Sequence, residues 1–338
     1  MNPPEGYTKA GPGEVCHLKR SLCGLKQASR QWHVEFCSKL LDFGFVQSAF
    51  DHCLFIKKSD HSYLALLVYV DDVLITGSHD EDIAVVKAYL HKAFTIKDMG
   101  SAKYFLGLEI ARTASGTYIN QRKYIMDILE DTGSPLSSPD RFRRLVGRLL
   151  YLNLTRPDIA YGVQQLSQFV NAPCTEHWDA ALHLVRYLKG NPSLGLFYSA
   201  SSSCSLTAYC DADWGACVDT RRSLTGYCVF LGDCLISWKT KKQQTVSRSS
   251  AEAEHRSLSM TVYELLWLSY IAADFQRTKH LEIDCHLVRD QFKAGFVLPQ
   301  KVSSQFQLAD MFTKALGPSA FHKLIGYLGL QDVHHVPS

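Results

Sequence analysis

The first third of the chain mixes hydrophobic patterns of two periods. Apolar residues at Ile83, Val86 and Leu90 recur at helical spacing and predict a helix over 80–93. The apolar segments 63–69 and 73–76 flank two aspartates and predict a β-hairpin. Other elements expected here are a helix at 28–41, a strand at 52–57, and a hairpin formed by 102–112 and 116–121. This part is therefore expected to be a mixed α and β structure.

The middle of the chain is predicted to be helical and the last third to return to strands. Helices are expected at 122–130, 142–152, 159–169 and 178–188. Strands follow at 206–210, 226–231 and 234–237, then near 244–246, before a long helix at 251–272. Three antiparallel strands before a helix, the first ending in carboxylates, indicate an α/β domain with its own function. The turn-forming segment 133–140 and the serine-rich segment 199–205 are the expected boundaries.

Composition narrows the class of protein. The chain has 338 residues, of which 46% are hydrophobic, so it is not a disordered protein. The formal net charge is only +3, which means that a nucleic-acid partner must be recognised by local basic patches. The apolar run 64–70 is too short to span a bilayer, and the N-terminus lacks the apolar core of a signal peptide. We expect an intracellular globular protein without a membrane partner.

The 11 cysteines do not suggest a disulfide framework. Their number is odd, and none are spaced as C-x-x-C. Cys210 with Cys217, or Cys285 beside His286, are conceivable metal ligands. Small buried hydrophobic side chains in a reducing compartment are the favoured interpretation.

The aspartate pair Asp71 and Asp72 lies at the tip of the predicted hairpin. Two adjacent carboxylates repel each other and are costly to desolvate unless a cation joins them. Magnesium ions that bind a phosphate during nucleotide transfer would supply that cation. A solvated turn is the simpler alternative for an isolated pair, because aspartate is common in turns.

The residues around this pair favour the magnesium site over the solvated turn. LLVYVDDVLITG at 66–77 resembles the polymerase signature of reverse transcriptases, and LKRSLCGLKQASRQW at 18–32 resembles the entry block of the Ty1/copia retrotransposon polymerase. The series continues in the same order along the chain with FTIKDMGSAKYFLGLEI at 94–110, FRRLVGRLLYLNLTRPDIAYGV at 142–163, LTAYCDADWGACVDTRRSLTGYCVFLG at 206–232, SWKTKKQQTVSRSSAEAEHRSL at 237–258 and QLADMFTKALG at 307–317. The chain thus resembles the C-terminal part of a copia-type Pol polyprotein, with reverse transcriptase followed by ribonuclease H.

The resemblance implies a fold and an order of domains. The fold is α+β to α/β: a partial reverse transcriptase palm at 1–133, a helical thumb and connection at 134–204, a truncated ribonuclease H-like domain at 205–318, and a tail at 319–338. In the palm, Asp71 and Asp72 would be catalytic Mg²⁺ ligands. Residues that would border the nucleotide and the template–primer are Gly24, Lys26, Gln27 and Arg30, with Gly100 and Tyr104 in the hairpin that grips the primer.

The second domain would carry a second two-metal site. Its Mg²⁺ ligands would be Asp211, Glu254 and Asp310, drawn from different elements as hydrolysis of a phosphodiester requires. If the match to the family were shifted by two residues, Asp213 would take the place of Asp211, and Glu252 the place of Glu254. The strongest local basic patch consists of Lys239, Lys241, Lys242 and Arg248, with Trp238 beside them. It would bind the backbone of a hybrid duplex, although a solvated strand face would look the same.

Two pieces that the family requires are missing. The first polymerase aspartate belongs upstream of the Gly24 block, where this chain has no counterpart. At 272–277 the family has a strand and its third ribonuclease H aspartate, whereas here the flanking helices run together. We therefore expect an RNA-directed DNA polymerase and ribonuclease H fragment that is impaired in both reactions.

The alternatives are a non-catalytic remnant that binds RNA–DNA hybrid or another polymerase chain, and a chain that folds poorly. The implied partners are an RNA template with a DNA primer, RNA–DNA hybrid and deoxynucleoside triphosphates. The sequence defines neither an oligomeric state nor a choice between a cytoplasmic particle and the nucleus.

Overall fold

The protein is described from a computed structural model, which shows a mixed α and β structure with several antiparallel sheets. Apart from residue 295 and a few isolated positions before residue 18, the structure describes residues 28–59, 61–70, 72–94, 96–131, 138–275 and 297–332. The chain divides into two compact units. The first comprises 1–100 with 274–277, and the second comprises 101–273 with 278–338. Each unit is described by itself.

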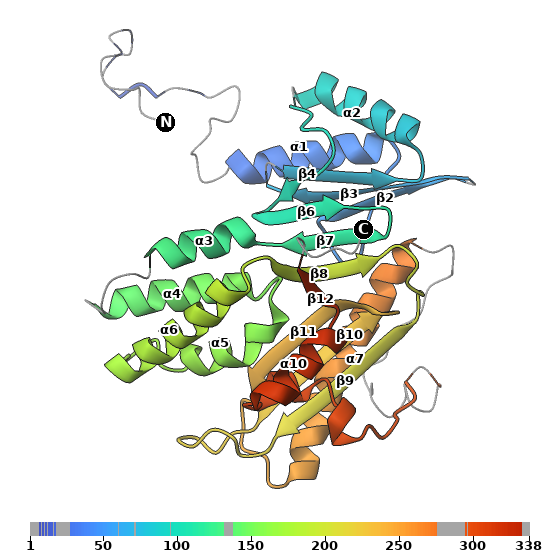
Figure 1. Cartoon of the computed structure of the whole chain (residues 1–338). Helices are drawn as coiled ribbons and strands as arrows, with labels where there is room; N and C mark the ends of the chain where they lie inside the picture. The colour runs from blue at the N-terminus through green and yellow to red at the C-terminus, as the bar shows by residue number, and fades with distance from the viewer. Residues whose placement is uncertain are drawn as a thin grey trace. The chain divides into compact units, whose positions relative to one another are not determined.

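The first unit contains a four-stranded antiparallel sheet in the order β1-β2-β3-β4 (Figure 1). The strands are β1 (Val46–Gln47), β2 (Leu54–Lys58), β3 (Tyr63–Tyr69) and β4 (Asp72–Gly77), with helices α1 (Ala28–Asp42) and α2 (Asp80–Phe94). Phe36, Leu66 and Leu90 are fully buried in one core between these elements. The structure confirms both helices and the hairpin, and it adds β1, which is too short to produce a hydrophobic pattern.

The hairpin between β3 and β4 turns within two residues. Tyr69 pairs with Asp72, and Val70 is the described residue of the turn between them. Val70 has a φ of 49°, in the left-handed region where a β-branched residue is strained. The tip of this hairpin is therefore held in an unfavourable backbone conformation.

The second unit begins with a five-stranded antiparallel sheet in the order β12-β8-β7-β6-β5. The strands are β5 (Tyr104–Phe105), β6 (Leu108–Arg112), β7 (Gly116–Asn120), β8 (Leu194–Ser199) and β12 (Leu330–Asp332). The expected strand over 102–112 is interrupted because Leu106 and Gly107 turn with φ of 49° and 74°. The segment expected as a tail contributes β12, which pairs with β8.

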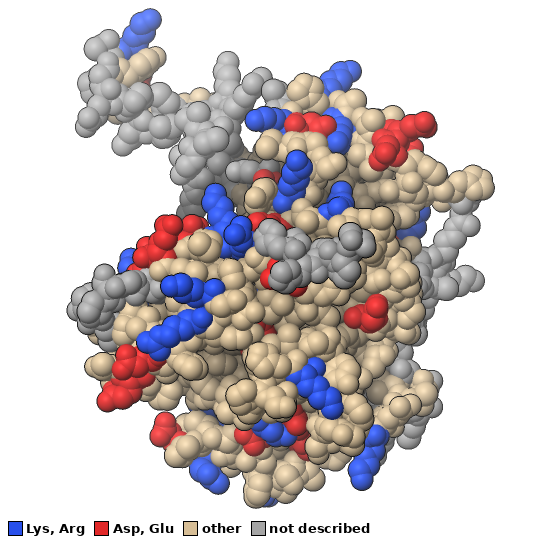
Figure 2. Space-filling view, viewed as in Figure 1, with Lys and Arg blue, Asp and Glu red and all other residues tan. Residues whose placement is uncertain are grey.

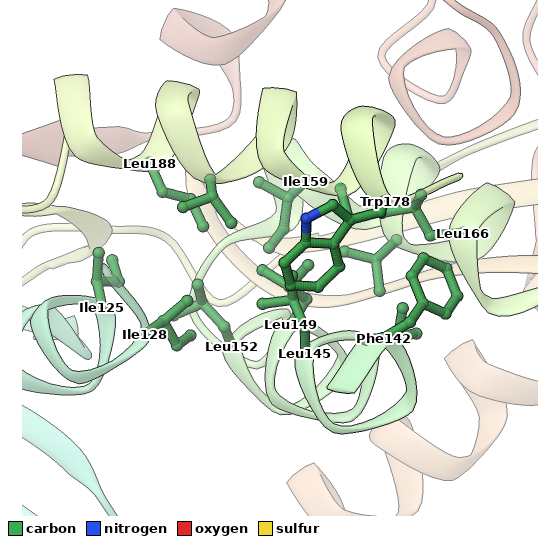
Figure 3. Packing of buried hydrophobic residues seen from close by; sticks show 14 residues of the cluster. Ile125, Ile128, Phe142, Leu145, Leu149, Leu152, Ile159, Leu166, Trp178 and Leu188 are labelled. Atoms are coloured by element: carbon green, nitrogen blue, oxygen red, sulfur yellow. The ribbon is translucent and has the colours of Figure 1, made fainter. Parts of the chain in front are cut away.

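Four helices pack together after β7. They are α3 (Arg122–Asp131), α4 (Pro139–Leu152), α5 (Ala160–Ser167) and α6 (Thr175–Gly190), and a 3-10 turn at Pro157–Ile159 precedes α5. Figure 3 shows their apolar faces meeting, with Leu149 of α4 and Trp178 of α6 among the side chains between the helices. Helical spacing of apolar residues predicted all four helices because each buries one such face.

A separate three-stranded antiparallel sheet follows, in the order β11-β10-β9 (Figure 1). Its strands are β9 (Leu206–Asp213), β10 (Leu224–Leu231) and β11 (Cys234–Lys242). Helix α7 (Ser250–Phe275) follows, and its residues up to 273 belong to this unit. A 3-10 turn (Ser304–Phe306), α9 (Asp310–Thr313) and α10 (Pro318–Tyr327) belong to it as well. The strand expected near 244–246 is wrong: β11 ends at Lys242, and a loop leads to α7.

The two sides of this sheet are covered by different helices. The Ser257 hydroxyl of α7 donates to the backbone carbonyl oxygens of Asp211 (2.8 Å) and Gly226 (3.3 Å). Residues of α9 pack against Gly226 from the side on which its Cβ would lie. In the part of the chain that the structure describes, β9 has a strand neighbour on one side only.

On the face shown in Figure 2, the charged side chains of the described residues do not gather into one patch of a single sign. Figure 2 shows lysine and arginine interspersed with aspartate and glutamate over the face in view. Among the described helices, none combines the length and the apolar character that a membrane span requires.

Candidate active site

Asp211 lies at the centre of a group of acidic side chains in the second unit. It sits in β9 opposite Gly226 of β10, so both residues direct their substituents to the face covered by α9. The Asp211 side chain is 11% exposed, and the Thr313 hydroxyl donates to its Oδ2 atom. The strand and α9 together fix this carboxylate in place.

Glu254 and Asp310 approach Asp211 from two helices. Glu254 is the fifth residue of α7, just after its first turn, and Asp310 is the first residue of α9. Lys314 lies between the carboxylates: its Nζ atom is 2.7 Å from Asp310 Oδ1 and 3.2 Å from Asp211 Oδ2. The three acidic residues expected to form the second site therefore come together, around a lysine that the sequence did not single out.

The carboxylates share an electrostatic environment. Desolvation raises the pKa of Glu254, and the negative charge of Asp211 raises it further. Desolvation also raises the pKa of Asp213, while the charge of Lys314 opposes that rise. Although burial alone would lower the pKa of Lys314, its hydrogen bond to Asp310 and the charge of Asp211 raise it. One ammonium group thus balances several acidic side chains.

The two-metal arrangement that the resemblance implies needs several carboxylates placed around the same ions. Among the described residues, no three aspartate, glutamate, histidine or cysteine side chains are arranged to hold a metal ion. The carboxylate oxygens that would bind a divalent ion instead face Lys314 and Thr313. In this geometry the residues do not fit a magnesium site.

Gly226 allows α9 to approach the sheet closely. A Cβ atom at this position would lie 2.6 Å from Thr313 Cγ2 and 2.7 Å from Phe312 Cβ. Phe312 and Thr313 precede Lys314 directly, so their position determines where Asp310 and Lys314 meet Asp211. The meeting of Asp211, Asp310 and Lys314 therefore depends on a glycine at position 226.

We expect Gly226→Ala to destabilise the protein by about 1–3 kcal/mol, because the added methyl group overpacks a buried contact. Urea denaturation followed by far-UV circular dichroism measures the loss. Ala208→Gly, a change of one methyl group on a neighbouring strand, is the control. Unchanged stability of Gly226→Ala would contradict the close approach.

The neighbouring acidic residue Glu252 forms hydrogen bonds at the start of α7. Its Oε2 atom accepts a hydrogen bond from the Arg248 backbone N–H at 2.7 Å, and its Oε1 atom pairs with Arg256 at 2.6 Å. That backbone hydrogen bond is the main reason why the pKa of Glu252 is lowered. Glu252 therefore stabilises the start of α7.

Trp214 is a further residue of this region, and the sequence predicted no role for it. It follows Asp213, and its Nε1–H donates to the Ser247 carbonyl oxygen at 2.9 Å. The indole is nevertheless 52% exposed. Tryptophan is usually well buried, so a tryptophan next to two aspartates is the signal in the sequence that would have indicated this exposed residue.

The predicted polymerase site is described only in part. Asp72 begins β4 and is exposed, as is Tyr69, whereas Asp71 lies outside the described residues. Gly24, Lys26 and Gln27 also lie outside them, and Arg30 is exposed on α1. The pairing of the two aspartates around a metal therefore stays a prediction.

Gly100 and Tyr104, predicted to contact the primer, belong to different units and are described separately. Gly100 has a φ of 74°, and its backbone N–H donates to Asp98. Tyr104 is 66% exposed and lines a pocket of about 530 Å³ together with Lys103, Arg112 and Arg122. An exposed aromatic ring among cations is the combination that single-stranded nucleic acid recognises.

The three lysines of β11 do not form one patch. Successive side chains of a strand point to opposite faces. Lys239 and Lys241 therefore share one face of β11, and Lys242 lies on the other. Lys242 donates to Gln168 Oε1 at 2.7 Å, whereas Lys239 and Lys241 are exposed. Only those two lysines form an exposed pair on one face of the strand.

The conceivable cysteine ligands are not supported. Burial, and then the charge of Glu254, raise the pKa of Cys210 to about 11, and no three described aspartate, glutamate, histidine or cysteine side chains are placed to hold a metal ion. Cys217 belongs to the group around Lys242 and Gln168. Cys285 and His286 lie outside the described residues.

Comparison with known proteins assigns the family. Residues 1–137 match the family model for reverse transcriptase (RNA-dependent DNA polymerase). The chain is 38% identical to the retrovirus-related Pol polyprotein from transposon RE1 of Arabidopsis thaliana, and 33% identical to that from transposon TNT 1-94 of Nicotiana tabacum. Each match covers 98% of this chain but only 26% and 29% of the relative, so the chain spans about a quarter of their length.

A shorter relative is matched over nearly its whole length. The putative transposon Ty5-1 protein of Saccharomyces cerevisiae is 32% identical over 78% of this chain and 94% of that protein. No solved structure gives a significant match. The chain belongs to the reverse transcriptase family and corresponds to a region of a copia-type retrotransposon Pol polyprotein.

Proposed function

We propose that the chain is a polymerase and ribonuclease H region that binds RNA–DNA hybrid, while both metal-dependent reactions of its parent are impaired. The observation that carries this proposal is the meeting of Asp211, Glu254 and Asp310, from β9, α7 and α9, around Lys314. Acidic groups from three separate elements are the arrangement that hydrolysis of a phosphodiester uses. Their pairing with an ammonium group supports the impairment.

The domains follow the same proposal. Residues 1–133 would be the palm with Asp71 and Asp72, 134–204 the helical thumb and connection, and 205–318 the ribonuclease H-like domain. The alignment with the RE1 polyprotein extends over 383 residues, more than the 338 of this chain, so segments of that relative have no counterpart here. The loss of such segments from both domains would remove catalytic groups of the polymerase and of the nuclease.

A second candidate function is a purely non-catalytic one, in which the chain only binds RNA–DNA hybrid or another polymerase chain. The absence, within the described residues, of three side chains placed to hold a metal favours it. The exposed pair Lys239 and Lys241 and the exposed ring of Tyr104 are available for a nucleic-acid backbone and a base. Deoxynucleoside triphosphates would then not be substrates.

The binding part of the proposal is tested by fluorescence anisotropy with a labelled RNA–DNA hybrid at several salt concentrations. Replacing both lysines, Lys239→Ala and Lys241→Ala, is expected to weaken binding and to reduce the slope of log K against log salt by about 1 for each lysine. Lys189→Ala, at an exposed position of α6, should leave the slope unchanged. Equal slopes for the wild type and the double variant would contradict a role for β11.

A further inference from the structure

The loop between β9 and β10 places Cys217 beside polar side chains from two other elements of the second unit. Gln168 directly follows α5, and Lys242 is the last residue of β11. Lys242 Nζ lies 3.6 Å from Cys217 Sγ and donates to Gln168 Oε1 at 2.7 Å. The Cys217 sulfur lies 3.6 Å from the same Gln168 oxygen. Each of the three groups therefore contacts the other two.

Backbone hydrogen bonds hold Cys217 in this position. Its N–H donates to the Arg222 carbonyl oxygen at 3.1 Å, and its carbonyl oxygen accepts from the Arg221 N–H at 2.7 Å. Arg221 has a φ of 52°, a left-handed conformation that non-glycine residues adopt mainly in tight turns. The sulfur is thus placed beside Lys242 by a turn that is closed on both sides of the cysteine.

The surroundings of the sulfur favour its negatively charged form. The hydrogen bond from the Thr220 side chain does most to lower the pKa of Cys217. Desolvation opposes this effect, whereas the Thr220 backbone and the charge of Lys242 lower the pKa further. At Cys210 and Cys37 burial dominates and raises the pKa. The thiolate is the nucleophilic form of cysteine, so Cys217 should be more reactive than these two residues.

Reagents in solution can reach this cysteine. Cys217 is half-buried, and the three residues that follow it, 218–220, are exposed. The described cysteines are free thiols, so a disulfide does not occupy the sulfur. An accessible thiolate that a neighbouring cation stabilises is the kind of cysteine that peroxides oxidise.

We propose that Cys217 is a modification site of this chain, at which a peroxide oxidises the thiolate to a sulfenic acid. The sulfur forms a bond to one peroxide oxygen and the O–O bond breaks. The second oxygen leaves as hydroxide, which takes up the proton that the thiol released. The sulfur is oxidised and the peroxide is reduced. The site uses none of the acidic residues of β9, α7 and α9, so this inference does not depend on the proposed function.

Sulfenic acid formation in the reduced full chain tests the proposal. The chain is treated with a limiting amount of hydrogen peroxide in the presence of dimedone, which traps sulfenic acids, and mass spectrometry of peptides measures each cysteine separately. We expect Cys217 to be labelled at least about fivefold faster than Cys204, although Cys204 is exposed. Labelling of Cys217 that is no faster than that of Cys204 would overturn the proposal.

Variants of the neighbouring groups test why this thiol reacts. Lys242→Gln and Thr220→Val should each slow the labelling of Cys217 by about three- to tenfold, because each removes a group that stabilises the thiolate. The labelling of Cys204 is expected to stay the same. Lys189→Gln, at an exposed lysine of α6, is the matched control and should leave both rates unchanged.

Thr220 is exposed in the loop, so Thr220→Val tests the same point if Lys242→Gln does not fold. Circular dichroism shows whether each variant is folded. A rate at Cys217 that stays at the wild-type value in every folded variant of these two positions would also overturn the proposal. Because no nucleic acid is present, neither result depends on whether the chain binds RNA–DNA hybrid.

Discussion

Replacing Arg156 by methionine should lower the free energy of unfolding by about 3–5 kcal/mol, because it leaves a buried carboxylate without its counter-charge. The side chains of Arg156 and Asp158 are both 0% exposed. Arg156 binds Asp158 through two nitrogens, with Nε 2.9 Å from Oδ1 and Nη2 2.7 Å from Oδ2. The Tyr187 hydroxyl also donates to Asp158, and Arg156 Nη1 donates to the Asn191 carbonyl oxygen.

Urea denaturation followed by tryptophan fluorescence measures this loss, since Trp178 lies in the same group of helices. Arg186→Met, at an exposed position of α6, is the matched control and should stay within about 0.5 kcal/mol of the wild type. Arg156→Lys should recover little, because lysine cannot reproduce two-point binding of a carboxylate. A loss below about 1 kcal/mol for Arg156→Met would contradict a buried, unscreened pair.

Leu149→Ala is expected to cost about 2–5 kcal/mol, because it opens a cavity in the core of the helical group. Leu149 is fully buried on α4 and lies among side chains of the neighbouring helices, as Figure 3 shows. The next residue, Leu150, is 48% exposed on the same helix.

Leu150→Ala therefore makes the same chemical change without a cavity, and it should cost less than about 1 kcal/mol. Both variants are compared with the wild type by thermal denaturation followed by circular dichroism. Equal losses of stability for Leu149→Ala and Leu150→Ala would contradict the orientation of α4, in which Leu149 faces the core and Leu150 does not.

Elements that bury one face were predictable from the sequence. The helices around 80–93 and 251–272 and the hairpin around Asp71 and Asp72 follow from periodic apolar residues, and the structure contains them. β12 was missed because three residues carry no periodic pattern, and its pairing with β8 joins positions more than 100 residues apart. The break at Leu106 and Gly107 was missed because apolar residues continue through the turn.

The candidate site was predictable in its acidic residues but not in its charge balance. Resemblance to the family indicated Asp211, Glu254 and Asp310, and the structure brings them to one place. Lys314 stands four residues after Asp310, a spacing typical of an ordinary exposed helical pair, so nothing indicated that it also reaches Asp211. For Lys242, alternation along β11 was the signal that separates it from Lys239 and Lys241.

The most direct test of the proposed function is a gel with a labelled RNA template annealed to a differently labelled DNA primer. The chain is incubated with this substrate, Mg²⁺ and deoxynucleoside triphosphates, beside Asp71→Asn and Asp211→Asn variants. We predict that the chain shifts the duplex while both strands keep their length. Primer lengthening that Asp71→Asn abolishes, or RNA shortening that Asp211→Asn abolishes, would contradict the impairment of the two reactions.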